Sequence, residues 1–123
     1  MGKFFESDKV RMEMEDIYDL QKELYSVIMK FPGMSDEAKF LHIETVKELL
    51  EKQQIMWTRL SLSDDPEAFK MKENIRAGSK EMGFGDADLN MIFANMRKTL
   101  DQMQKTLKRL LLKKVTRLCR WFC

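Results

Sequence analysis

The sequence predicts an all-α fold: an antiparallel helical bundle of three long helices plus one short helix, with the last helix long and overhanging the others. Three observations support this prediction. Apolar residues recur every three or four positions over long stretches, which is the spacing of one face of a helix. Only 2 Pro and 5 Gly occur in 123 residues, so breaks are few. The hydrophobic content of 44% beside 34% charged residues is typical of a globular chain that can bury a core.

The first predicted helix begins at Ser7 or Asp8, because either side chain can cap a helix by accepting a free backbone N–H. It ends near Phe31, because Pro32 disfavours helical geometry in the residue before it. Gln21 interrupts its inner stripe. The apolar residues of that stripe are Val10, Met14, Ile17, Leu24 and Ile28.

The second predicted helix runs from the cap Ser35 to about Leu60. We expect His42 to lie beside the core rather than in it. The inner stripe of this helix consists of Ile43, Val46, Leu50, Trp57 and Leu60, with Met56 at its flank.

A short third helix begins at Asp65-Pro66, a cap followed by the residue that best fits the first helical position. Gly78 weakens this helix, and we expect it to end at Gly83.

The last predicted helix starts at Asp86 or Asp88 and continues to Phe122. At about 1.5 Å per residue it measures roughly 50 Å, whereas the first two helices reach roughly 35 Å, so its last ten or so residues should overhang. We therefore predict a bundle domain over residues 1–107 and a basic amphipathic helical extension over residues 108–123. The apolar residues of the last helix recur in steps of four and three: Leu89, Phe93, Met96, Leu100, Met103, Leu107 and Leu110.

The charge distribution sets this end apart. Seven of the 22 Lys and Arg residues and none of the 20 acidic residues lie from Lys105 onwards, which leaves residues 1–104 with a net charge of −5. Basic residues at a helix C-terminus interact favourably with the helix dipole, but seven are more than this interaction requires. The predicted partner-binding residues are Lys108, Arg109, Leu112, Lys113, Arg117, Arg120, Trp121 and Phe122.

Such a helix can dock its apolar face in a groove of a partner protein, guided by charge. It can also self-associate, or lie on an anionic membrane surface with its terminal aromatic residues among the headgroups. Nucleic acid fits less well, because phosphates bind exposed cations rather than an apolar stripe.

Methionine is frequent, with 11 residues, and its flexible side chain suits adaptable contact surfaces. We expect Met14, Met96 and Met103 to pack in the core. Off those stripes, the residues that could line an interface are Met12, Met71 and Met91.

The residue inventory does not predict an enzyme, a cofactor or a metal site. His42 is the single histidine, so neither a Glu-x-x-His metal pair nor a nucleophile–base pair can be assembled. Cys119 and Cys123 alone cannot form a zinc site. The sequence has two cysteines, no signal peptide and no apolar run long enough to span a membrane. We therefore expect a reduced intracellular, cytoplasmic location. Binding through the basic extension would place the protein at a membrane surface or within a virion.

Three segments, Phe4–Val10, Arg59–Asp65 and Met91–Met103, carry a resemblance. Their order and spacing over about residues 3–107 are similar to a small cyanobacterial family of unknown function, family 1825 of the domain-of-unknown-function series, which phages of marine cyanobacteria also carry. The resemblance implies a small helical protein of a cyanobacterium or its virus. It supplies no activity and no site residues, and the basic end after Leu107 departs from the family pattern.

These observations together predict a non-enzymatic helical adaptor or regulator that docks a larger host or viral protein complex through a Met-rich surface and its basic C-terminal helix. Two alternatives stay open: a structural, self-assembling or virion component, and a peripheral membrane protein that binds through the same amphipathic helix.

Overall fold

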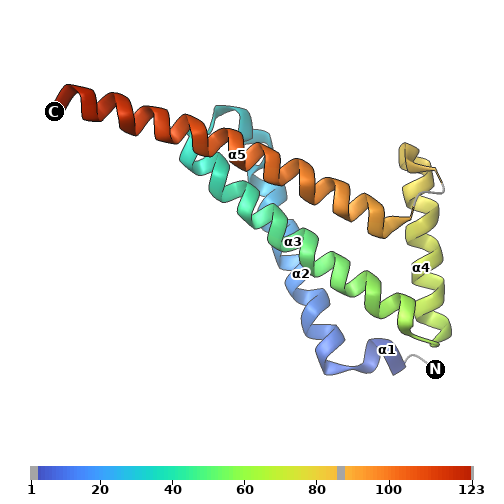
Figure 1. Ribbon diagram of the computed structural model, residues 1–123. Helices are drawn as coiled ribbons and strands as arrows, with labels where there is room; N and C mark the ends of the chain where they lie inside the picture. The colour runs from blue at the N-terminus through green and yellow to red at the C-terminus, as the bar shows by residue number, and fades with distance from the viewer. Residues whose placement is uncertain (1–2, 86–87, 123) are drawn as a thin grey trace.

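A computed structural model describes residues 3–85 and 88–122, and the side chains as far as residue 114. Its helices are α1 (Lys3–Glu6), α2 (Asp8–Val27), α3 (Asp36–Leu62), α4 (Pro66–Ser79) and α5 (Leu89–Phe122). A 3₁₀ segment, η1 (Ile28–Gly33), follows α2, and a π-helical segment, η2 (Lys80–Phe84), follows α4 (Figure 1). The described residues contain no strand, so the predicted all-α class of three long helices and one short helix is confirmed.

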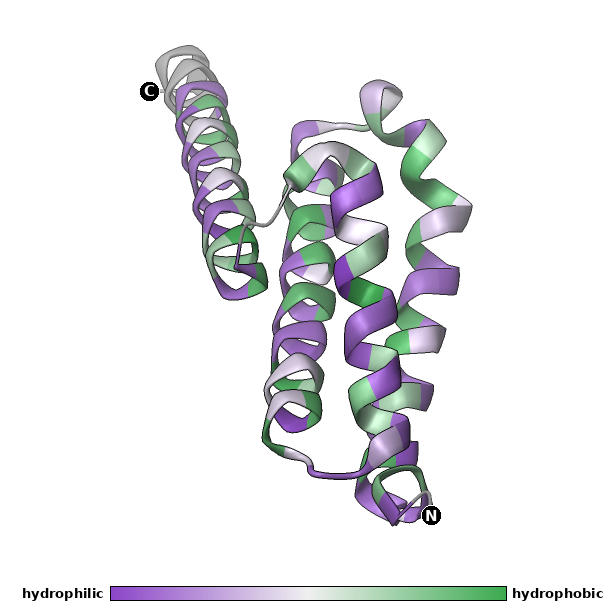
Figure 2. Ribbon diagram, turned by 90° about the vertical axis from the view of Figure 1, so that its right-hand side faces the viewer, coloured by the Kyte–Doolittle hydropathy of each residue, from purple (hydrophilic) through white to green (hydrophobic). Residues whose placement is uncertain are grey.

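Helix α3 is the centre of the fold, because α2, α4 and α5 all pack against it. Figure 1 shows α5 close to α3 near the start of α3, and the two helices diverging toward α4, which spans the gap at that end. Every helix carries both hydrophobic and hydrophilic residues (Figure 2), as expected for helices that bury only one side. The bundle is therefore open on one side rather than closed around a single axis.

The predicted helix starts are confirmed by side-chain caps. Ser7 accepts a hydrogen bond from the backbone N–H of Val10 at 3.4 Å, and Ser35 accepts one from Ala38 at 3.1 Å. Asp65 caps α4, with its Oδ1 3.0 Å from the N–H of Glu67 and Pro66 at the first helical position. Each cap satisfies a backbone donor that the helix leaves without a partner.

Asp88 caps α5 by accepting a hydrogen bond from the N–H of Asn90 at 3.0 Å, as one of the two predicted candidates. Asp86, the other candidate, lies outside the described residues.

The core is small and centred on the C-terminal half of α3. Its predicted stripe is confirmed at Ile43, Leu50, Trp57 and Leu60, which are all buried, while Val46 is half-buried. Around Trp57 the buried cluster consists of Val10, Met56, Trp57, Leu60 and Ala68. His42 is half-buried beside Phe31, with ring centroids 5.4 Å apart, in agreement with its predicted place beside the core.

Several predicted core positions are wrong. Helix α2 ends at Val27 instead of near Phe31, and Ile28, in the following 3₁₀ segment, is 50% exposed. The tighter turn of a 3₁₀ segment moves a side chain off the α-helical stripe. Met96 and Met103 of α5 are also exposed, at 46% and 39%. Met96 precedes the contacts that α5 makes with α3 at Asp101 and Gln104, and Met103 lies about 100° around the helix from Gln104, the side chain that faces α3.

The end of α4 also differs from its prediction. The α-helix ends at Ser79, and Gly83, the predicted end, lies inside η2 with a φ of +95°. Residues with a side chain rarely adopt this left-handed conformation, so glycine enables the turn that leads into α5.

Polar contacts hold α5 against the first half of α3. Gln104 is buried, donates from Nε2 to Glu44 at 2.6 Å, and accepts from Nζ of Lys47 at 3.0 Å. Lys47 also pairs with Asp101 at 2.6 Å. On the other side of α3, Arg59 donates from Nη2 to Oε1 of Glu13 in α2 at 2.9 Å, and its Nε lies 2.7 Å from the second carboxylate oxygen, so the two side chains form an ion pair. These pairs fix the register of α2 and α5 on α3.

The predicted overhang is confirmed. Helix α5 has 34 residues and α3 has 27, so α5 is about 10 Å longer. Figure 1 shows its C-terminal turns extending past the start of α3.

Candidate functional site

The first candidate surface is the side of α5 that faces away from α3. Of the predicted partner-binding residues, Lys108, Arg109, Leu112 and Lys113 have described side chains, and all four are exposed. At 100° per residue they fall within an arc of about 140° around the helix axis. The structure therefore brings them together on one face.

The opposite side of the same helix binds the body of the protein. Gln104 and Leu107 are buried and Leu111 is half-buried. With Lys114 they occupy an arc of about 80° that does not overlap the outer face. The remaining predicted residues, Arg117, Arg120, Trp121 and Phe122, belong to the helical backbone of α5, but their side chains lie outside the described residues.

Lys114 marks the place where α5 leaves the body. Its Nζ lies 2.9 Å from Oδ2 of Asp36 in the first turn of α3. The hydrogen bond to Asp36 and the charge of that carboxylate raise the pKa of Lys114 above its ordinary value of 10.5. This ion pair attaches the inner side of the helix and leaves the outer, basic side to the solvent.

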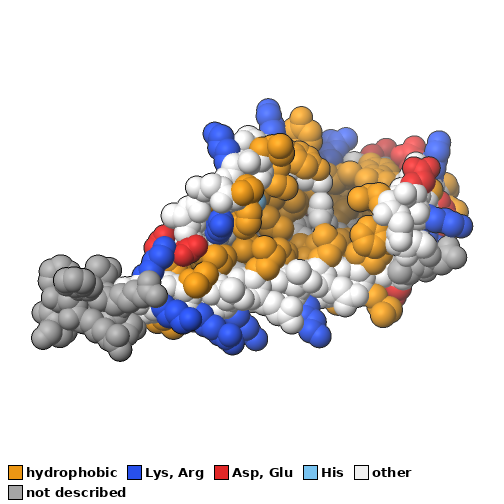
Figure 3. All heavy atoms as spheres, turned by 90° about the horizontal axis from the view of Figure 1, so that it is seen from above, with side chains coloured by type: hydrophobic (Ala, Val, Ile, Leu, Met, Phe, Trp, Pro, Cys, Tyr) orange, Lys and Arg blue, Asp and Glu red, His pale blue; other side chains and the backbone are white. Residues whose placement is uncertain are grey.

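The second candidate surface is an apolar groove that the sequence did not predict. It has a volume of about 490 Å³ and lies where α3 and α5 diverge, with α2 behind it and α4 at its end. Figure 3 shows hydrophobic side chains gathered in a hollow of the surface. Its apolar lining comes from all four helices: Met14 and Ile17, then Met56, Trp57 and Leu60, then Met71 and Ile75, and Phe93.

Three uncharged polar side chains, Tyr18, Gln21 and Gln53, also line this groove. No Asp, Glu, Lys or Arg lines it. Gln21 interrupts the apolar stripe of α2. The groove explains a polar residue at this position, because a side chain at the rim of an opening need not be apolar. The sequence signal that could have indicated the groove is this break together with the crowding of methionines nearby.

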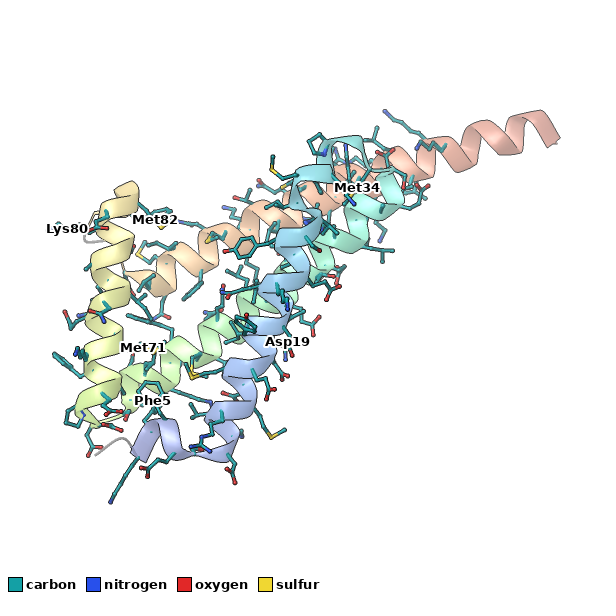
Figure 4. The ribbon with its side chains drawn as sticks, turned by 180° about the vertical axis from the view of Figure 1, so that it is seen from behind. Phe5, Asp19, Met34, Met71, Lys80 and Met82 are labelled. Carbon is teal, nitrogen blue, oxygen red and sulfur yellow. The ribbon has the colours of Figure 1, made fainter. Side chains whose placement is uncertain are left out.

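The methionines expected at an interface divide between two places. Met71 lines the groove and reaches from α4 into the opening (Figure 4). Met12 and Met91 are 65% and 64% exposed on other faces. Met29 and Met82 are exposed still further, at 88% and 77%. Exposed methionines at these fractions add apolar area to the surface without charge.

An acidic cleft lies between α2 and α3. It is lined by Asp16, Asp19, Leu20, Glu23, Glu48 and Lys52, and Asp19 is labelled in Figure 4. Lys52 lies 3.7 Å from Asp16 across it. Among the described residues, no group of three or more His, Cys, Asp and Glu side chains is arranged to hold a metal ion.

In the described part of the chain, no helix combines the length and the apolarity that a membrane crossing requires.

One comparison with known proteins gives a match. The model of a protein family described as "Domain of unknown function (DUF1825)" matches residues 2–107. No curated protein and no solved structure matches the chain. The family match ends at Leu107, which is also the last residue that is buried among residues 3–85 and 88–114.

Proposed function

Since this chain belongs to the DUF1825 family, whose function is unknown, we propose from its surfaces that it is a small non-enzymatic adaptor that docks a larger protein complex. The basic outer face of α5 and the exposed methionines form the docking surface. The resemblance to cyanobacterial and phage proteins makes a complex of such a host, or of its virus, the partner to test first.

A single observation supports this proposal above the others. Lys108, Arg109, Leu112 and Lys113 share the side of α5 that turns away from the body, while Lys114 holds the other side to Asp36. The helix presents cations around an exposed leucine, on a support that is already ordered. A partner with an apolar groove and acidic rims is complementary to such a face, because charge accelerates and orients the encounter and apolar contact supplies affinity.

The test is a quantitative capture experiment. Lys108, Arg109 and Lys113 are changed together to Glu in the full chain, and the amount of each co-purifying protein is measured against the wild type. We expect the specific partner to be lost by about tenfold or more, because each cation becomes a repulsive charge. Wild-type capture should weaken as salt rises, since exposed charges are screened.

A matched control separates location from charge. Changing Lys22, Lys30 and Lys70, which are exposed on α2, η1 and α4, to Glu alters the net charge by the same amount. This variant should capture the partner as the wild type does. If both triple variants lose the partner equally, net charge alone explains the loss, and a docking face on α5 is contradicted.

The same two variants test the membrane alternative. Salt-sensitive flotation of the wild type with anionic vesicles, lost in the α5 triple variant and retained in the control, would assign the face to lipid instead of protein. The adaptor proposal expects no flotation of any of the three proteins.

A further inference from the structure

The surface of this protein is too large for its mass. The chain exposes 9438 Å², whereas a monomeric globular protein of 14.7 kDa exposes about 6,900 Å². The excess is about 2,500 Å², roughly three times the area of about 800 Å² that each partner loses in a standard interface. The projecting end of α5 accounts for part of this excess, and the opening between α3 and α5 for another part.

The apolar groove is an uncharged portion of this surface. Trp57 and Leu60 form its floor, and Tyr18, at its rim, is 63% exposed. An exposed apolar surface of this kind, bounded by polar groups, is typical of an association site. Because the groove lies open along the side where α5 leaves α3, an element of protein can enter it.

We propose that this groove is the interface at which a second copy of this chain docks, in a two-fold symmetric dimer. A symmetric interface must be complementary to itself, so the same patch must offer a hollow and a ridge. The groove is the hollow. The ridge is the edge of α5 beside it, where Met96 is 46% exposed and lies within about 60° of Phe93, a lining residue, on the same side of the helix.

Charge supports a second copy as the occupant. Two identical patches bring identical charges together, and like charges in contact oppose association. The eleven side chains that line the groove carry no charge, so the two linings bring no like charges into contact with each other. The dimer leaves the basic outer faces of both α5 helices free, so that one adaptor presents two docking faces.

The test is the mass in solution of the full chain, measured by sedimentation equilibrium from about 1 to 100 µM. The wild type should approach twice 14.7 kDa. In Tyr18→Lys a cation replaces an exposed ring at the groove rim, and the dissociation constant should rise by about tenfold or more, because an unpaired charge would be buried in the interface.

Tyr25 provides the matched control. It lies two turns further along α2, is 71% exposed, and does not line the groove. Tyr25→Lys makes the same chemical change and should leave the dimer as strong as in the wild type. Circular dichroism should show the same helicity for all three proteins, since both tyrosines are exposed.

A second measurement locates the contact without weakening it. A photoreactive p-benzoylphenylalanine placed at Tyr18 should yield a covalent dimer on illumination, and the same group at Tyr25 should not. Three results would overturn the proposal: a wild type that stays monomeric at every concentration, a dimer that Tyr18→Lys leaves intact, or crosslinking that is equal at the two positions. A monomer that binds an apolar dye, released by Tyr18→Lys, would assign the groove to a small ligand instead.

The dimer proposal and the docking-face proposal can be contradicted independently of each other. The Lys108, Arg109 and Lys113 triple variant should remain dimeric while it loses the partner, and Tyr18→Lys should lose the dimer while each monomer still binds through α5.

Discussion

At the scale of single residues, Asp65 connects two parts of the chain that are far apart in sequence. Its Oδ1 caps α4 through the N–H of Glu67, and its Oδ2 accepts the N–H of Phe4 at 2.8 Å. The second bond holds α1 against the start of α4, where Phe4 and Phe5 pack edge to face with ring centroids 5.0 Å apart. One carboxylate therefore caps the helix that it begins and joins that helix to α1.

This arrangement predicts a specific dependence on pH. The N–H groups of Phe4 and Glu67 lower the pKa of Asp65 below its ordinary value of 3.8, against a smaller opposing effect of burial. A carboxyl group whose pKa is lower in the folded chain stabilises the fold fully above the unfolded value, and this contribution disappears as pH falls through the folded value. The Asp65 contribution is therefore complete above about pH 5, begins to fall near pH 3.8, and is lost as the pH drops through the lower pKa of the folded chain.

We expect Asp65→Asn to retain the cap, since Asn caps helices as well as Asp does, but to lose this part of the pH dependence. Its Tm should fall less steeply than that of the wild type as the pH is lowered through the acid range, as measured by thermal circular dichroism. Asp64→Asn, at the exposed neighbouring position, should follow the wild type. Parallel curves for the wild type and Asp65→Asn would contradict this explanation.

At the scale of elements, a turn follows α4 at the end of the molecule where α3 and α5 diverge. It reverses the chain through Gly83 at a φ of +95° and Gly85 at a φ of +62°. Figure 1 shows α5 beginning near the end of α4 and approaching α3 further along its length. The polar contacts of α5 with α3 lie near the middle of α5, at Asp101 and Gln104, with the buried Leu107 one turn further on.

Two glycines of this region should respond in opposite ways to the same change. Gly78 lies in helix α4, and a methyl group added there meets no atom within 4 Å. Gly78→Ala should therefore raise stability by about 0.4–1 kcal/mol, because Ala restricts the unfolded chain. Gly83 has equal space, but its positive φ strains any side chain, so Gly83→Ala should lower stability by about 1 kcal/mol or more. Urea unfolding of the two variants measures both effects, and a shared sign would refute the assigned backbone conformation.

At the scale of the whole molecule, the chain consists of a body organised around α3 and a helix that extends beyond it. The division predicted between residues 1–107 and 108–123 coincides with the end of the family match. It stays a prediction, because association and unfolding measurements are needed to show that the two parts act separately.

A pair of leucines on α5 tests this division. Leu107 is 9% exposed and Leu112 is 60% exposed, five residues further along the same helix. Leu107→Ala should reduce the free energy of unfolding by about 2–4 kcal/mol, through lost burial and the cavity left behind. Leu112→Ala should change it by no more than about 0.5 kcal/mol, while it weakens capture of the partner. Equal losses of stability in urea would place Leu112 within the body and contradict the boundary.

The helix starts and the outer face of α5 could be predicted from local pattern, and the groove could not. Ser35, Asp65 and Asp88 act within their own first turns, so the adjoining sequence contains all the information needed to recognise them. Gln104 shows the opposite case. In the sequence it is one polar residue among many on α5, and only the approach of Glu44 and Lys47 from α3 explains why it is buried.

By itself the sequence determined the class of the fold, the order and approximate bounds of the long helices, and the overhang of α5, because periodicity, caps and length are local properties of a chain. Only the tertiary structure decided that α5 leaves α3 halfway along its apolar stripe and that Met96 and Phe93 border an opening instead of a closed core. The physical reason is that a stripe records which side of a helix avoids water, but not which neighbour covers it. That depends on contacts between residues more than fifty positions apart, such as Gln104 with Glu44.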